Sequence, residues 1–315
     1  MAVRSDGCSW ALGHLDMPPH QVAMFYYFRA TAHLDGGDLA AAVADAGQAL
    51  AQEPGLMAAR WLRANTADGL RRYDDAMADW NELIKQHPEM PQLYIMRGLT
   101  LDDQGHSTEA VAEESKAIEL EGERATGTVL VDRAVSYTAL RQFDRAQADT
   151  AEAIRREPNL PRAYEWQGKL DFLQGRFDAA VEDFTKAGDL DHADPYKALW
   201  LYLSLIRQGR AGEDELRSRL GQLDPDRWPT PLVKVMLGEA KPDAIATPTL
   251  PDHWSAADRR AGADCEIAFY RAEQLLARGD RDGARKLFAA SVATGISEYD
   301  EYRFAKIELD QMGAK

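Results

Sequence analysis

Apolar residues recur along the first two thirds of the chain with the spacing of amphipathic helices, in a unit that repeats about every 34 residues. Pro54 and Pro88 each close a helical segment and are 34 residues apart, and Pro158 closes a later unit after a short insertion. A fixed period of roughly 20–50 residues is typical of solenoids and other repeat architectures. The pattern therefore predicts a tandem array of helices.

Two positions of each unit carry a small residue, as expected where two helices cross closely. The eighth position holds Ala30, Ala64, Gly98, Ala134 and Gly168. The twentieth position holds Ala42, Ala76, Ala110, Ala146 and Ala180. Short turns with the sequences GDL, RRYD, RQFD or GRFD lie between these positions, so each unit is expected to be a helix, a tight turn and a second helix.

These residues resemble the tetratricopeptide repeat over residues 23–210, with five regular units and a looser sixth. The resemblance implies an all-α fold, a superhelix of antiparallel helix pairs. Each pair leaves an apolar face that the next pair covers, so stability comes from stacking between neighbours.

The regular pattern divides the chain into four expected segments. Residues 1–22 form a partial N-terminal repeat or cap, and residues 23–224 form the array. Residues 225–264 are rich in proline, which interrupts helices, and are expected to form an irregular linker with a short helix near 232–237. Residues 265–315 restore one final unit and add a capping helix.

Charge and hydropathy restrict the partners. The formal net charge is −15 and the pI is about 4.9, which argues against a nucleic-acid or anionic-membrane surface and favours basic partners. The longest strongly apolar run, Ala198–Ile206, is about half the roughly 20 residues that a membrane-spanning helix needs, so a buried core helix is expected.

No pattern of catalytic, metal-binding or cofactor-binding residues stands out. The seven histidines are scattered, and no nucleophile motif or phosphate-binding glycine loop is present. Acidic residues are abundant, but nothing selects one pair as catalytic. Cys8 and Cys265 are either two thiols or one bridge, and the sequence leaves both possibilities open. We therefore expect a protein that is not an enzyme, with no catalytic residue, metal or cofactor.

The tetratricopeptide resemblance implies a binding groove on the concave surface, formed by the first helix of each unit. Tyr27, Trp61, Ile95 and Val131 occupy equivalent positions and are expected to form an apolar ladder along it. Asp35, Asp68, Asp102 and Asp103 are expected to form an acidic edge beside the ladder. Further groove residues by the same register are Leu34, Asn65, Gln92, Leu99 and Val135. The alternative is that Trp61 only packs against its neighbours and the aspartates are solvated helix ends.

The second half of the chain resembles, more narrowly, the NlpI-type tetratricopeptide lipoproteins of the bacterial envelope. The resemblance lies in Tyr196–Leu203, in the segment from Trp228 to Gly238, and in the final unit from Cys265 onward. It implies an adaptor that dimerises and brings peptidoglycan-trimming hydrolases to a protease. The chain departs from the pattern because no lipoprotein signal precedes Cys8. A periplasmic or envelope location is expected if an upstream signal has been removed, and a cytoplasmic one if the chain is complete.

The leading hypothesis is a scaffold whose concave groove binds a protein segment with hydrophobic and basic residues. One alternative is a cytoplasmic assembly co-chaperone. A second is an enzyme, or the regulatory subunit of one, with its site in the proline-rich stretch from Trp228 to Trp254 near His253.

Overall fold

The computed structural model describes residues 5–192, 194–220, 228–248 and 254–313, and over these residues it contains seventeen α-helices and no strand. The first nine helices are α1 (Ser5–His14), α2 (Pro19–Asp35), α3 (Leu39–Gln52), α4 (Met57–Gly69), α5 (Tyr73–Gln86), α6 (Pro91–Asp103), α7 (Ser107–Glu121), α8 (Gly127–Ala139) and α9 (Phe143–Arg156). The remaining eight are α10 (Pro161–Leu173), α11 (Phe177–Leu190), α12 (Pro195–Arg207), α13 (Glu213–Leu220), α14 (Thr230–Met236), α15 (Ala256–Ala277), α16 (Arg281–Ala293) and α17 (Asp300–Gly313).

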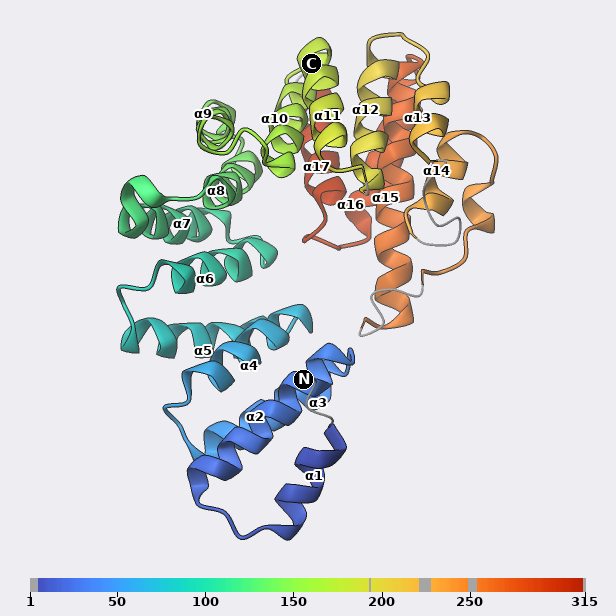
Figure 1. Cartoon of the computed structure of the whole chain (residues 1–315). Coiled ribbons are helices and arrows are strands. Elements are labelled where there is room, and N and C mark those ends of the chain that lie inside the picture. Colours follow the sequence, from blue (N-terminus) through green and yellow to red (C-terminus); the bar gives the residue numbers. More distant parts are fainter. Residues whose placement is uncertain (1–4, 193, 221–227, 249–253, 314–315) are drawn as a thin grey trace.

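The helices pair and stack along a curved path, which confirms the all-α solenoid (Figure 1). Six pairs follow one another from α2 and α3 to α12 and α13. Helix α1 lies against α2 and buries Cys8 and Ala11, as expected for a segment that covers the open side of the first pair. A last pair, α15 and α16, is followed by α17, which lies beside α10 and α15.

The small residues are where two helices approach most closely. The alanines at both repeated positions are fully buried. A Cβ atom placed on Gly168 would lie 3.1 Å from three atoms of the Phe184 ring, and one on Gly98 would lie 3.2 Å from Cγ of Glu114. The eighth position of the unit is therefore small because the second helix of the same pair occupies the space.

An ion pair links the two helices of each of the first four pairs, and the same spacing of 16 residues separates its members. Arg29 binds Asp45 through two hydrogen bonds of 2.6 and 2.7 Å. The other three pairs are Arg63 with Asp79, Arg97 with Glu113, and Arg133 with Asp149, at 2.7 to 2.8 Å. Two hydrogen bonds between a guanidinium group and a carboxylate restrict the relative orientation of the two helices as well as the distance between them. We call this series the arginine–acid ladder.

The fifth pair breaks the arginine–acid ladder. It retains the acid as Asp183, but the position of the arginine is taken by Gln167. The Gln167 Oε1 atom is buried and has no hydrogen-bond partner in the described part of the chain. Burial, and then the nearby Asp171 carboxylate, raise the pKa of Asp183 to about 7. The fifth pair therefore keeps a carboxyl group that has lost its cation.

Seven turns between paired helices place one residue in the left-handed region, and five of these residues are glycines. The other two are Arg71, with φ of 58°, and Arg141, with φ of 59°. The backbone hydrogen bonds are the same in both kinds of turn: the amide of Arg71 bonds to the carbonyl of Asp68, and that of Gly105 bonds to that of Asp102. A residue with a Cβ atom costs about 1 kcal/mol in this conformation, so the two arginines need a separate explanation.

The segment between the array and the last pair is more helical than its proline content predicts. Helix α14 lies where a short helix was expected. Helix α15, however, begins at Ala256, inside the expected linker, rather than near Cys265. Ser255 caps it by accepting a hydrogen bond from the Asp258 amide at 3.0 Å, and the last proline, Pro251, precedes this cap.

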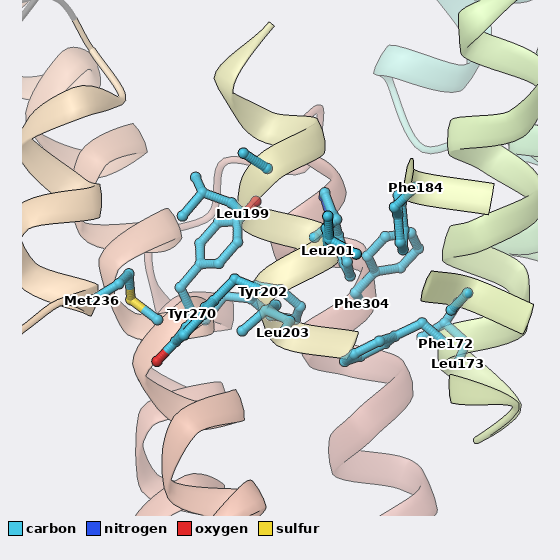
Figure 2. Packing of buried hydrophobic residues seen from close by; sticks show 14 of the residues in the cluster. Phe172, Leu173, Phe184, Leu199, Leu201, Tyr202, Leu203, Met236, Tyr270 and Phe304 are labelled. Carbon is cyan, nitrogen blue, oxygen red and sulfur yellow. The ribbon is translucent and has the colours of Figure 1, made fainter. Parts of the chain in front are cut away.

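The largest apolar cluster joins the end of the array to the last three helices (Figure 2). Trp200 of α12 is 1% exposed and lies at its centre. Its ring centroid is 5.4 Å from Phe172 and 5.8 Å from Phe184, both in the preceding pair. It is also 5.6 Å from Phe269 of α15 and 5.3 Å from Phe304 of α17. The last helices therefore cover the apolar face that the sixth pair would leave open.

Replacing Gly168 by leucine is expected to destabilise the fold, because the new side chain must displace the Phe184 ring from a filled core. The expected loss of unfolding free energy is about 2 kcal/mol, measured by chemical denaturation. Gly47→Ala is the matched control. Gly47 lies inside α3 with only the Arg63 guanidinium nearby at 3.8 Å, so alanine should stabilise the protein by roughly 0.5–1 kcal/mol. Equal effects of the two substitutions would contradict the close crossing.

Gln167→Arg is expected to restore the fifth member of the arginine–acid ladder. The new guanidinium would face Asp183 at the same spacing as in the first four pairs, lower the pKa of that carboxyl group and raise the free energy of unfolding by about 1 kcal/mol. Denaturation at pH 7 measures the gain. In an Asp183→Asn background the gain should vanish, and a gain that persists there would show that the arginine acts elsewhere.

Candidate functional site

The expected groove residues of the first three pairs lie on first helices and keep part of their surface exposed. Asp35, Asn65 and Gln92 are exposed. Tyr27, Leu34, Trp61, Asp68, Ile95, Leu99 and Asp103 are half-buried. Three further expected residues, Asp102, Val131 and Val135, lie closer to the last helices.

The apolar ladder changes along its length. Tyr27 packs against the alanines of α3 and α4, and Trp61 stacks edge-on against Trp80 at 5.2 Å between ring centroids. Ile95 packs between α7 and α8. Val131 is fully buried, and Val135 packs against the largest cluster. In this conformation the ladder is accessible from Tyr27 to Ile95 and closed at Val131, because the tight core begins there.

The acidic edge is partly occupied by the chain itself. Asp102 is 6% exposed, and its Oδ2 accepts a hydrogen bond from Nη1 of Arg303 at 2.5 Å. A second guanidinium nitrogen of Arg303 donates to the Asp102 carbonyl, and the Ser107 hydroxyl donates to Oδ1. Asp102 therefore binds α17 in this conformation and is not open to a partner, which differs from the exposed edge that the register predicts.

Two neighbouring acids, Asp68 and Asp103, have no such cation at hydrogen-bonding distance among the described residues. Burial raises the pKa of Asp68, and a bond from Thr100 opposes the shift. Burial, followed by the Asp68 charge, raises the pKa of Asp103 to about 7, although Arg303 lowers it. These groups keep the inner surface beside α4 and α6 acidic.

The last helices and the array line a partly open cavity of about 360 Å³, which the repeat pattern does not predict. Glu165, Lys169, Asp194, Tyr196, Trp200, Glu266, Glu298, Tyr299, Asp300 and Glu301 line it. Lys169 is its buried cation and bonds to Glu165 at 2.5 Å and to Asp300 at 2.9 Å. Burial acts to raise the pKa of Asp300, but the positive charges nearby, Lys169 first among them, together outweigh it, and the pKa is lowered overall.

Glu266 and Glu301 are buried in the wall of this cavity and bond to neutral donors. The Glu266 carboxylate accepts from the Tyr196 hydroxyl and from the Trp228 indole at 3.0 to 3.2 Å. The Tyr270 hydroxyl donates to Glu301 at 3.0 Å. Burial raises the pKa of Glu301 to about 7, and burial together with the Glu301 charge raises the Glu266 pKa well above its usual range. Both carboxyl groups therefore hold their protons at higher pH than exposed carboxyl groups do.

Sequence reasoning missed this cavity and the arginine–acid ladder. Glu266 stands inside the apolar run from Cys265 to Tyr270, and a charge within a buried helix is a signal that could have found it. The ladder could have been found from the acid that follows position seven by 16 residues in each of the five regular units. His253 of the alternative hypothesis lies outside the described residues, whereas Trp228 contacts the cavity wall through Glu266.

The described residues contain no group of three or more His, Cys, Asp or Glu side chains placed to hold a metal ion. None of their helices has the length and apolar character that crossing a membrane requires. Cys8 and Cys265 are both buried free thiols, so they do not form the bridge that the sequence left open.

The chain matches a family model described as tetratricopeptide repeat over residues 27–80, 62–125 and 131–198, which together span more than half of its length. A tetratricopeptide repeat protein from Parabacteroides merdae is similar in structure, with a TM-score of 0.59 and 14% identity over 92% of this chain and 98% of that one.

Two further solved structures are also similar. PilW, described as a type IV pilus biogenesis factor, has a TM-score of 0.58 and 19% identity over 69% of this chain and 99% of its own. The pilF protein of Pseudomonas aeruginosa has a TM-score of 0.52 and 14% identity over 70% of this chain and 100% of its own. At these identities the similarity establishes the fold alone.

The raised carboxyl pKa values predict that stability falls as pH rises from about 5 to 8. In this window the folded chain keeps protons on Glu266 and Glu301 that the unfolded chain releases, so rising pH favours unfolding. The lowered Asp300 pKa acts only at lower pH. The melting temperature should therefore decrease between pH 5 and pH 8.

Glu266→Gln is expected to flatten this dependence, because the amide oxygen can still accept from Tyr196 and Trp228 but carries no charge. Glu109→Gln, at an exposed position of α7, is the matched control and should retain the wild-type slope. Melting curves at several pH values compare the three proteins. An unchanged slope in Glu266→Gln would exclude this carboxyl group as the cause.

Proposed function

The chain belongs to the tetratricopeptide repeat family, whose members generally mediate protein–protein interactions, and we propose that it binds a protein segment on the first helices of its first three pairs. The observation that supports this most directly is the exposure of these helices. Asp35, Asn65 and Gln92 are exposed beside the half-buried Tyr27, Trp61 and Ile95. Aromatic side chains flanked by polar groups are typical anchors of protein interfaces.

The charge of the inner surface favours a basic segment. Within the part of the chain that the structure describes, no cation lies at hydrogen-bonding distance from Asp68 or Asp103. The net charge of −15 attracts cationic partners over longer distances. A partner segment with apolar residues for the ladder and lysine or arginine for the acids matches this surface.

The role is that of a scaffold, not a catalyst. Tetratricopeptide folds are typically non-enzymatic, and the proposed surface works by contact area and charge. The resemblance of the second half to NlpI-type proteins extends the proposal to an adaptor for envelope hydrolases and a protease, with dimerisation. Affinity capture from the native host with the full chain tests this extension, and recovery of cytoplasmic assembly clients instead would favour the co-chaperone alternative.

Exposed polar positions give a sharper test of the surface than its aromatics. Replacing Trp61 would also disturb its stack on Trp80, whereas Asn65 and Gln92 have no such role. Asn65→Lys with Gln92→Lys places two positive charges on the proposed face. We expect at least tenfold weaker binding of the captured partner by calorimetry, which is about 1.4 kcal/mol.

Gln52→Lys with Gln86→Lys is the matched control, because both positions are exposed on the second helices α3 and α5. It adds the same charge to the opposite helix of each pair and should retain most of the affinity. Equal losses in the two double variants would indicate a general effect of net charge and would reject the first-helix face.

A further inference from the structure

The two arginines that occupy left-handed turn positions both reach the last part of the chain. We call residues 254–313, with α15, α16 and α17, the C-terminal unit. Nε of Arg71 is 2.9 Å from Oε1 of Glu298, its guanidinium lies 3.6 Å from Asp258, and its Cζ lies 5.5 Å from the centre of the Trp254 ring. Arg141 forms an ion pair with Asp310 and a bond of 3.4 Å to the Lys306 carbonyl. The side chains that make these turns unfavourable are therefore the ones that bind the C-terminal unit.

A third contact to the C-terminal unit comes from the third helix pair, which lies between the pairs that carry the two arginines. Arg303 of α17 is 13% exposed and binds both the carboxylate and the carbonyl of Asp102, at the end of α6. The second, third and fourth pairs thus each contribute one charged contact to the C-terminal unit: Arg71, Asp102 and Arg141. Figure 1 shows the curved array and the C-terminal unit facing one another across its inner side.

These contacts differ in kind from those that hold the C-terminal unit to the end of the array. Phe304 of α17 packs on Trp166 and Trp200 inside the largest apolar cluster. The apolar clusters built on α2 to α6 contain, among the described residues, no residue of the C-terminal unit. The C-terminal unit is therefore fixed to the fifth and sixth pairs by a core, and to the earlier pairs by charged and hydrogen-bonding side chains.

We propose that Arg71, Arg141 and the Arg303–Asp102 pair form a latch that holds the solenoid in its curved, closed form and controls access to the inner surface. A stack of helix pairs bends through small changes at each interface, so breaking a few polar contacts allows the first pairs to move away from the C-terminal unit. Apolar burial in the largest cluster resists such motion at α8 and at α10 to α12, and not at α4 to α6. The latch goes beyond the proposed binding function, since it concerns the shape of the free chain.

The turns themselves supply the variants that test the latch. Glycine at Arg71 and Arg141 reproduces the residue of the five sister turns, so it relieves the backbone while removing both guanidinium groups. Arg303→Gln is added to release Asp102. Arg72→Gln with Arg145→Gln is the matched control: both are exposed arginines next to the same turns, and their bonds are to Asp75 and Gln142.

Small-angle scattering of the full chain measures the result. The triple variant is expected to have a larger radius of gyration than the wild type, with unchanged helical content by circular dichroism, and the control is expected to match the wild type. Should the loss of Arg303 prevent folding, the Arg71→Gly and Arg141→Gly double variant gives the same comparison. A folded variant with the wild-type radius of gyration would overturn the latch.

Access to the inner surface gives an independent measurement that needs no partner. Asp103 is half-buried beside Arg303, and a cysteine placed there should react with a maleimide at least tenfold faster in the double glycine variant. The two buried native cysteines are replaced by alanine for this experiment. An unchanged rate would show that the contacts do not gate this surface. Loss of partner binding with a working latch would reject only the proposed function.

Charge reversal separates the ion pair from other effects of substitution. Arg141→Asp should expand the chain, and Asp310→Arg in the same chain should restore the wild-type radius of gyration, because the exposed pair is rebuilt in the opposite sense. Failure of the second substitution to restore it would mean that Arg141 acts without Asp310, contrary to the latch.

Discussion

Trp200 is the contact on which the two parts of the molecule depend. A stack of helix pairs always ends in an uncovered apolar face, and here the indole of α12 presents that face to α15 and α17. Phe172 and Phe184 hold the ring from the array side, and Phe269 and Phe304 hold it from the other. Because Trp200 fixes the C-terminal unit to the end of the array, the rest of this unit lies along the inner side of the curve. There Arg303 forms an ion pair with Asp102.

Charge is distributed according to the same geometry. The net charge of −15 means that carboxylates outnumber cations in this chain. The arginine–acid ladder neutralises one carboxylate between the two helices of each of the first four pairs. Where no described cation lies close, as at Asp183 and Glu266, burial raises the pKa instead.

The inner surface therefore has two regions with different roles. Over α2, α4 and α6 the first helices remain exposed, and this is the region to which we assign binding. From α8 onward the inner side is filled, first by Val131 in the core and then by α17. The latch contacts lie at the boundary between these two regions. A change of curvature at this boundary would alter the binding surface.

The repeat could be predicted from the sequence because its determinants are local. Ala30, Ala64 and the equivalent residues mark the place where the two helices of one unit cross. Each unit then packs on the units before and after it in the chain. The cavity at Glu266 and the occupation of Asp102 depend on contacts between distant residues, such as Tyr196 with Glu266 and Arg303 with Asp102. A periodic pattern does not predict contacts between residues that are far apart in the sequence. The curvature of the whole array, which is the sum of small rotations at each unit, decides which distant residues come into contact. The sequence by itself determined the helix pairs and their order, and the tertiary structure decided which part of the inner surface stays open.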